Sequence, residues 1–137
     1  MNFRILGTLQ AEVDGKLVDL GPPKQRSLLA LLLLNANQSV ATDRLIDLIW
    51  GEAHPRTADH SIHIYVSALR KLLADSDERI ETRSPGYTLK VHPEELDSLR
   101  FQRLVEKGET DGLRQALQLW TGEPLSDFAY EDWAQPH

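Results

Sequence analysis

Residues 57–89 decide the fold, and they read TADHSIHIYVSALRKLLADSDERIETRSPGYTL. The first half predicts an amphipathic helix from about residue 57 to about residue 74, because its apolar residues recur at i, i+4, i+7 and i+11. The second half predicts a β-hairpin, with strands at 80–83 and 87–91 around the turn sequence Ser84-Pro85-Gly86. The helix stripe that should face the core is Ile62, Val66, Leu69 and Leu73.

Two more helices are expected before this stretch. Residues 24–34 follow two prolines and are dense in Leu and Ala, which predicts a helix buried on most sides. Residues 42–50 predict a second helix, with Thr42 as its N-cap and Gly51 at its end. Pro55 disfavours helix in the residue before it, so residues 51–56 should form a loop, and the third helix should be capped by Thr57 or Asp59.

The first 20 residues predict a small antiparallel sheet. Phe3, Ile5 and Leu9 are apolar at mostly odd spacing, and Asp14-Gly15 is a type I′ hairpin signal. The expected fold class is therefore α+β: an N-terminal antiparallel sheet, three helices and a C-terminal hairpin, the order of a winged helix-turn-helix. After Pro93, apolar residues at helical spacing predict a partial helical domain with two helices.

Composition excludes several classes of protein. With 137 residues, 41% of them hydrophobic, the chain can form one core and part of another. Its longest apolar run, residues 28–34, is far shorter than the roughly 18 residues of a membrane span. Residues 1–7 lack the features of a secretory signal, so we expect a cytoplasmic protein with no membrane contact. The chain has no cysteine, which excludes disulfides, thiol nucleophiles and cysteine zinc sites.

The net charge of −6 argues against nucleic-acid binding by bulk electrostatics, because phosphate neutralisation supplies much of such affinity. The acidic residues are concentrated after residue 96. Residues 1–96 carry 11 Lys and Arg against 13 Asp and Glu, whereas residues 97–137 carry 4 against 8. A protein that binds DNA needs only a local basic face.

Such a face is predicted opposite the apolar stripe of the third helix, where polar side chains cluster at about 100° per residue. Hydrogen-bonding groups there suit base edges, an isoleucine suits a thymine methyl group, and basic residues on the helix, the hairpin and the first helix suit phosphates. The expected DNA-binding residues are Lys24, Gln25, Arg26, Arg56, His60, Ser61, His63, Ile64, Ser67, Arg70, Lys71, Arg83 and Tyr87.

Other interpretations of these residues stay open at this point. The polar face is also typical of any solvated amphipathic helix. His60 and His63 lack a further well-placed ligand, which disfavours a metal site. Residues 83–86 also fit a tight turn with no binding role, and Trp50 fits core packing. Nothing resembles a nucleophile elbow, a phosphate-binding loop or a helical zinc-protease motif, so we expect no enzyme, no cofactor and no small-molecule site.

The chain resembles winged helices of the OmpR/PhoB type and, among them, the SARP group of bacterial antibiotic regulatory proteins. The resemblance is carried by Ile5-Leu6-Gly7 with residues 21–26, by residues 65–73, and by residues 82–89 with their Pro-Gly-Tyr-x-Leu sequence. Residues 97–101 and 116–125 resemble the start of the helical bacterial transcriptional activation domain that follows. The expected domains are 1–95 for the winged helix and 96–137 for a truncated start of the activation domain.

The resemblance implies a transcription activator that binds direct repeats in double-stranded DNA as a head-to-tail dimer, recruits the RNA polymerase holoenzyme and regulates antibiotic biosynthesis. One departure is Ala68, where the group commonly has Arg, which affects the expected sequence preference. The negative net charge keeps a second class open, a protein-interaction module with minor DNA binding. The resemblance also implies a polymerase contact in the loop formed by Gly51, Glu52, Ala53, His54 and Pro55, which continues to Arg56.

Overall fold

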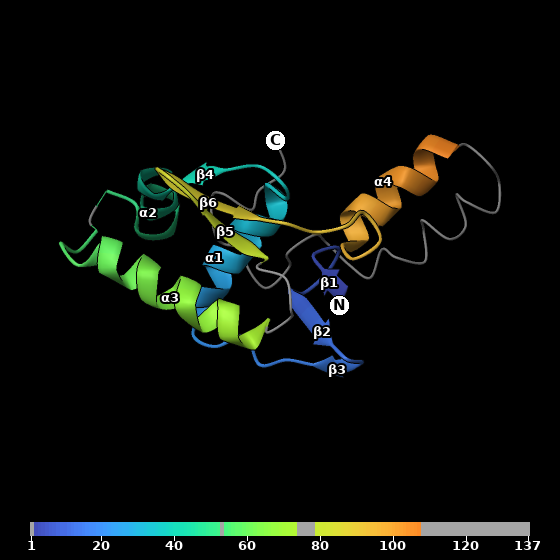
Figure 1. Cartoon of the computed structure of the whole chain (residues 1–137), viewed down its shortest axis with the longest axis horizontal. Coiled ribbons are helices and arrows are strands. Elements are labelled where there is room, and N and C mark those ends of the chain that lie inside the picture. Colours follow the sequence, from blue (N-terminus) through green and yellow to red (C-terminus); the bar gives the residue numbers. More distant parts are fainter. Residues whose placement is uncertain (1, 53, 74–78, 108–137) are drawn as a thin grey trace. The chain divides into compact units, whose positions relative to one another are not determined.

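The computed structural model describes residues 2–52, 54–73 and 79–107 (Figure 1). Contacts divide the chain into two compact units. One unit contains Asp19–Val91, and the other contains Met1–Val18 with His92–His137. Among the described residues, no helix is long and apolar enough to cross a membrane.

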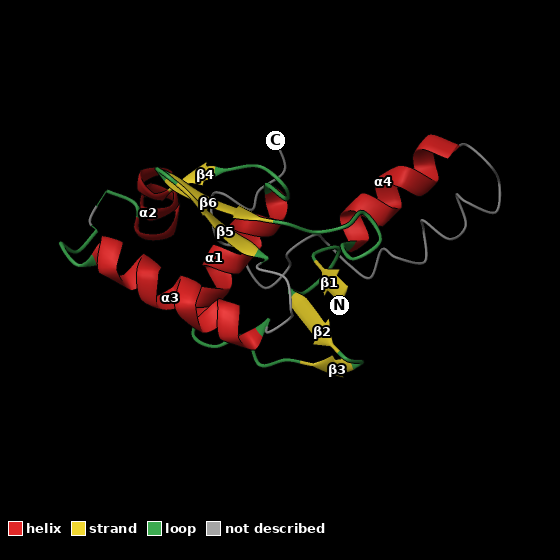
Figure 2. Cartoon of the chain, in the orientation of Figure 1, coloured by secondary structure: helices red, strands yellow, loops and turns green. Residues whose placement is uncertain are grey.

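The unit Asp19–Val91 is built from three helices and a three-stranded antiparallel sheet (Figure 2). The three helices contact one another, and α1 also contacts β6. The sheet has the strand order β4-β6-β5. Its elements in chain order are α1 (Pro23–Leu34), β4 (Val40–Ala41), α2 (Thr42–Trp50), α3 (Ala58–Leu72), β5 (Ile80–Arg83) and β6 (Gly86–Leu89).

The core of this unit forms around α1, which is buried from Ser27 to Leu33, as its run of Leu and Ala predicts. The predicted stripe of α3 is also confirmed: its four residues, from Ile62 to Leu73, are between 0 and 3% exposed. Burying four such side chains stabilises the unit by several kcal/mol at roughly 1.5–3 kcal/mol each. This packing fixes which face of α3 is left at the surface.

The hairpin of β5 and β6 follows α3 as expected. Ile80 pairs with Leu89 and Arg83 pairs with Gly86, so Ser84 and Pro85 form a two-residue turn across a cis peptide bond. Asn37 joins the far end of the hairpin to the α1–β4 segment, because its side chain bonds both the amide and the carbonyl of Val91.

Two details differ from expectation. β4 pairs with β6 through Val40 and Tyr87, and a strand of two residues is too short to leave a periodic signal. The expectation that Thr42 is the N-cap of α2 is wrong. Thr42 is the first helical residue, Ala41 is the N-cap because it still belongs to β4, and the Thr42 amide donates to Pro85 O at 3.0 Å.

The second unit contains an antiparallel sheet of β1 (Asn2–Arg4), β2 (Gln10–Val13) and β3 (Lys16–Leu17), together with α4 (Asp97–Lys107). The Asp-Gly hairpin is confirmed: φ is 52° at Asp14 and 79° at Gly15, the two positive values that a type I′ turn requires. The expected helix around residues 113–119 lies outside the described residues.

Asp97 joins the start of α4 to the N-terminal strand. Its side chain is 4% exposed, and its two carboxylate oxygens accept the amides of Ile5 at 2.8 Å and Leu6 at 2.9 Å. Burial raises the pKa of Asp97 above its ordinary value, and hydrogen bonds from backbone amides oppose this shift. Contacts thus group residues 1–18 with α4, whereas the sequence predicts a boundary between residues 95 and 96.

Candidate nucleic-acid interface

The surface of α3 opposite its buried stripe is open to solvent. His60, His63, Ser67 and Lys71 are exposed, and Ser61 is half-buried. Ile64 is 52% exposed and adds an apolar side chain to this surface. The exposed surface of α3 therefore combines hydrogen-bonding groups, a cation and an apolar contact, the mixture that reads base edges in a major groove.

Tyr87 lies behind this surface rather than on it. The residue is 4% exposed, and its hydroxyl oxygen is 3.2 Å from Nδ1 of His63. The two rings meet edge to face, with centroids 6.4 Å apart. Tyr87 was expected to contact DNA, but its burial leaves His63 as the surface residue of this pair.

Arg70 connects α3 to the hairpin. Its Nε and Nη2 donate to Ile80 O at 3.0 and 2.8 Å, and Nη2 also donates to Thr82 Oγ1 at 2.8 Å. Hydrogen bonds from a charged guanidinium are stronger than those between neutral groups, and these three, two to the Ile80 carbonyl and one to the Thr82 hydroxyl, fix the position of β5 relative to α3. Arg70 was expected to contact DNA, and in this structure its exposed side chain also joins α3 to the hairpin.

Arg83 lies next to the tip of the hairpin with its side chain 62% exposed. Its Nη2 is 3.3 Å from Glu81 Oε2, and Lys90 Nζ is 3.8 Å from the same oxygen. Exposed ion pairs of this kind contribute about 0–1 kcal/mol, so Arg83 can leave Glu81 for a phosphate at little cost.

One residue that was expected to contact DNA is buried at the start of α1. Gln25 is 6% exposed, and its side-chain amide donates to Leu20 O at 2.9 Å, so it closes the turn before α1 and lies away from the surface. Lys24 is exposed, and its Nζ lies 5.3 Å from the ring centre of Trp50. Trp50 in turn stacks on Tyr65 with ring centres 6.3 Å apart. Arg26 is half-buried.

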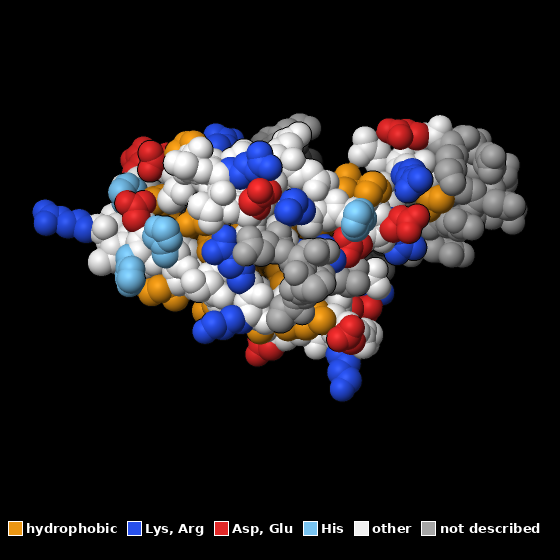
Figure 3. Space-filling model, viewed as in Figure 1, with side chains coloured by type: hydrophobic (Ala, Val, Ile, Leu, Met, Phe, Trp, Pro, Cys, Tyr) orange, Lys and Arg blue, Asp and Glu red, His pale blue; other side chains and the backbone are white. Residues whose placement is uncertain are grey.

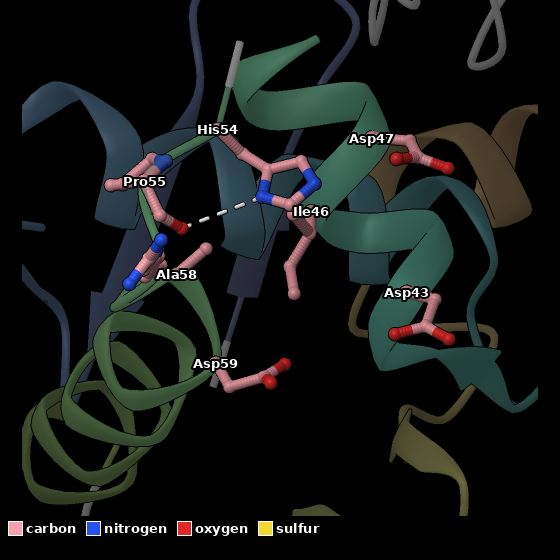
Figure 4. A pocket seen from close by; sticks show the side chains of 8 residues that line it. Asp43, Ile46, Asp47, His54, Pro55, Ala58 and Asp59 are labelled. Atoms are coloured by element: carbon pink, nitrogen blue, oxygen red, sulfur yellow. Dashed lines mark hydrogen bonds between the residues drawn. The ribbon is translucent and has the colours of Figure 1, made fainter. Parts of the chain in front are cut away.

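The loop between α2 and α3 is exposed at Gly51, Glu52, His54, Pro55 and Arg56, and Ala53 lies outside the described residues. Beside this loop is a pocket of about 350 Å³. Figure 4 shows side chains from α2, the loop and the start of α3 around it, with His54 Nδ1 3.4 Å from Pro55 O. Three carboxylates line the pocket, from Asp43, Asp47 and Asp59. Arg56 also lines the pocket, and three carboxylates against this one arginine leave a net negative charge that favours a basic partner over DNA.

The charge of this unit differs from that of the whole chain. Residues 19–91 carry nine Lys and Arg and nine Asp and Glu, so the net charge of −6 lies entirely outside them. In Figure 3, histidines gather over the end of the unit where α2 meets α3, and Lys and Arg side chains lie over α3 and the hairpin. No group of three potential metal ligands occurs among the described residues.

Comparison with known proteins decides the family. The family model described as "Transcriptional regulatory protein, C terminal" matches residues 15–89, more than half of the chain. The chain belongs to this family of transcriptional regulators. The match covers all three helices and the hairpin, and it confirms the resemblance to winged helices of the OmpR/PhoB type.

Individual regulators extend the similarity along the chain. EmbR of Mycobacterium tuberculosis is 37% identical over 99% of this chain and 39% of EmbR. AfsR of Streptomyces coelicolor is 36% identical over 92% of this chain and 14% of AfsR, and DnrI of Streptomyces peucetius is 31% identical over 93% and 54%. These relatives confirm the resemblance to SARP regulators, and the chain spans between 14 and 54% of their lengths.

A solved structure confirms the fold class. The structure of Mycobacterium tuberculosis EmbR in complex with a low affinity phosphopeptide superposes with a TM-score of 0.87 at 34% identity, over 97% of this chain and 39% of that one. The winged helix-turn-helix with an N-terminal antiparallel sheet is therefore the fold of this regulator.

The partners that position the surface residues were not predictable from the regulator's sequence. Arg70 donates hydrogen bonds to Ile80 and Thr82. Trp50 contacts both Lys24 and Tyr65. These contacts join elements across loops, so no spacing within one element predicts them. One feature of the sequence did point to the contacts of Trp50. A half-buried aromatic residue at the end of a helix commonly packs against another aromatic ring or a cationic side chain.

Proposed function

We propose that the regulator binds double-stranded DNA in a sequence-specific manner, with α3 in the major groove and the β5–β6 hairpin in an adjacent minor groove. The observation that carries the proposal is the exposed polar surface of α3, held at a fixed distance from the hairpin by Arg70. Lys24, Arg26, Arg56, Lys71 and Arg83 serve as phosphate contacts around it.

We further infer that the regulator activates transcription, binding direct repeats as a head-to-tail dimer. Similarity to AfsR and DnrI supports a role in antibiotic biosynthesis, as the SARP group implies. Two copies on adjacent repeats present two α3 helices to the same face of the duplex, and each repeat then adds its own base contacts. Affinity should therefore depend on the spacing between repeats.

DNA binding is tested by fluorescence anisotropy with a duplex that carries tandem repeats from the promoters next to the regulator's own gene, against a scrambled duplex. We expect about a thousandfold preference for the repeats. Five phosphate contacts predict that log K falls against log salt with a slope of about −4.5 per bound copy. Equal weak binding to both duplexes would overturn the proposal and favour the protein-interaction module that the charge of −6 supports.

The second part of the proposal places a polymerase contact in the loop of Gly51, Glu52, His54 and Pro55. The loop is exposed, and its acidic pocket suits a basic segment of the polymerase holoenzyme. A Glu52→Gln/His54→Ala variant is expected to lower transcription in vitro roughly tenfold, because a central interface residue contributes about 1–2 kcal/mol.

The same loop variant should keep its affinity for the repeat duplex, since these side chains lie outside the exposed surface of α3. Lys16→Ala, an exposed change on β3, is the control and should leave transcription unaltered. Unchanged transcription by the loop variant, or a loss that follows weaker DNA binding, would contradict a polymerase contact at this loop.

A further inference from the structure

The contact between His63 and Tyr87 determines which proton the histidine carries. Among the described residues, His63 Nδ1 is the one hydrogen-bond partner of the Tyr87 hydroxyl, at 3.2 Å. A buried hydroxyl group that fails to donate leaves its proton unsatisfied, which costs about 1–3 kcal/mol. Tyr87 as a whole is 4% exposed and its contact with His63 is part-buried, so we assign the hydroxyl as the donor and Nδ1 as the acceptor.

A ring nitrogen that accepts a hydrogen bond carries no proton, so the neutral His63 ring is protonated at Nε2. Nε2 is separated from Nδ1 by Cε1, so its N–H bond diverges from the bond to Tyr87, and His63 is exposed. The edge-to-face packing on Tyr87 also restricts the orientation of the imidazole. His63 therefore offers a hydrogen-bond donor of fixed position at the exposed surface of α3.

We propose that Tyr87 is a positioning residue that holds His63 as an Nε2–H donor, and that His63 thereby selects a base with an acceptor in the major groove. This inference rests on the proposed binding of α3 in that groove. Guanine offers N7 and O6 as acceptors, whereas cytosine offers only its N4 amino donor there. His63 thus favours guanine and disfavours cytosine at the base it faces.

His60 provides a comparison within the same helix. It is exposed, and its ring makes no hydrogen bond to the described residues, so both of its tautomers are accessible. His60 can act as donor or acceptor at different bases. His63 is restricted to one role, which gives it the larger share of sequence discrimination.

The test combines Tyr87→Phe with Tyr65→Phe as a matched control. Both changes keep an aromatic ring, but Tyr65 stacks on Trp50 and does not bond His63. The wild type and each variant of the 137-residue chain are incubated with a pool of duplexes that have a randomised central segment. The DNA that each protein binds is then sequenced. Tyr87→Phe is expected to reduce the preference for guanine over cytosine at one position by about three- to tenfold, the worth of one hydrogen bond, whereas Tyr65→Phe keeps it.

A double-mutant cycle separates positioning from a general structural effect. The His63→Gln side chain has an amide N–H donor at a similar distance from the backbone. An amide has no tautomers of this kind, so Tyr87 is not needed to set its donor. Adding Tyr87→Phe to His63→Gln should therefore leave base preference unchanged. An equal effect of Tyr87→Phe in both backgrounds would overturn the inference.

The tautomer is measured directly on the free protein by nitrogen-15 correlation spectra at about pH 8.5, above the range in which free histidine titrates. His63 Nδ1 should be unprotonated in the wild type, and its protonated fraction should rise in Tyr87→Phe toward that of His60. An unchanged tautomer in the variant overturns the inference even if the wild type selects DNA sequences. If the wild type selects no sequence at all, the proposed function fails first, and the role of His63 as a base selector fails with it.

Discussion

Gly86→Ala is expected to destabilise the regulator by about 3 kcal/mol, at the upper end of the range for overpacking. A Cβ atom at Gly86 would lie 1.9 Å from Val40 O, 2.5 Å from Val40 C and 2.7 Å from Ala41 Cα. All three are backbone atoms, so no side-chain rotation relieves the overlap. Strand β6 must move away from β4, and the pairs Val40 with Tyr87 and Ala41 with Gly86 are lost.

The free energy of unfolding is measured by urea denaturation, with Gly51→Ala as the control. Gly51 has φ of +72°, and nothing lies within 4 Å of an added Cβ. Backbone strain of roughly 1–3 kcal/mol opposes alanine there, because φ of 72° with ψ of −154° is a conformation that glycine alone adopts readily. If Gly86→Ala lowers the free energy of unfolding by no more than Gly51→Ala does, β4 does not restrain β6.

The same substitution connects the strand pairing to the interface. Tyr87 follows Gly86 on β6, and its hydroxyl reaches His63 on α3. Displacing β6 therefore moves the residue behind the exposed surface of α3. The two-residue strand β4 thereby helps to set the position of His63, the histidine that we propose as a base contact.

The sequence predicts the elements of this fold well, because each depends on a local pattern. The stripe of α3 follows from spacing alone, and the type I′ turn at Asp14-Gly15 follows from the need for two positive φ values. Strand β4 was not predictable in this way. Its two residues form a strand only because the hairpin passes beside them, which is a property of the tertiary structure.

The individual site residues were harder to predict than the surface that contains them. Helical spacing places Gln25 beside Lys24 and Arg26, but it does not show that the Gln25 amide closes a turn at Leu20 O. Arg70 similarly lies on the polar side of α3, yet the carbonyl of Ile80 is within its reach. Long polar side chains bind whichever partner the fold brings near, and that partner is set by non-local contacts.

His63→Ala combined with Lys71→Ala is expected to lower affinity for the repeat duplex roughly a hundredfold. A base contact contributes about 1–3 kcal/mol, the phosphate contact of Lys71 adds to it, and each 1.4 kcal/mol is a factor of ten. The slope of log K against log salt should fall by about 0.9, because one phosphate contact is removed. Both side chains are exposed, so the fold should persist.

The matched control is Lys16→Ala with His92→Ala, which removes the same two side-chain types from exposed positions of the other unit. Both double variants have the same net charge. If affinity for DNA depended on overall charge alone, both double variants would lose affinity equally. A loss of affinity confined to the variant in α3 assigns DNA binding to the exposed surface of that helix. Binding that survives in both double variants would remove the exposed surface of α3 from the DNA interface, and the loop between α2 and α3 with its pocket would become the principal interaction surface.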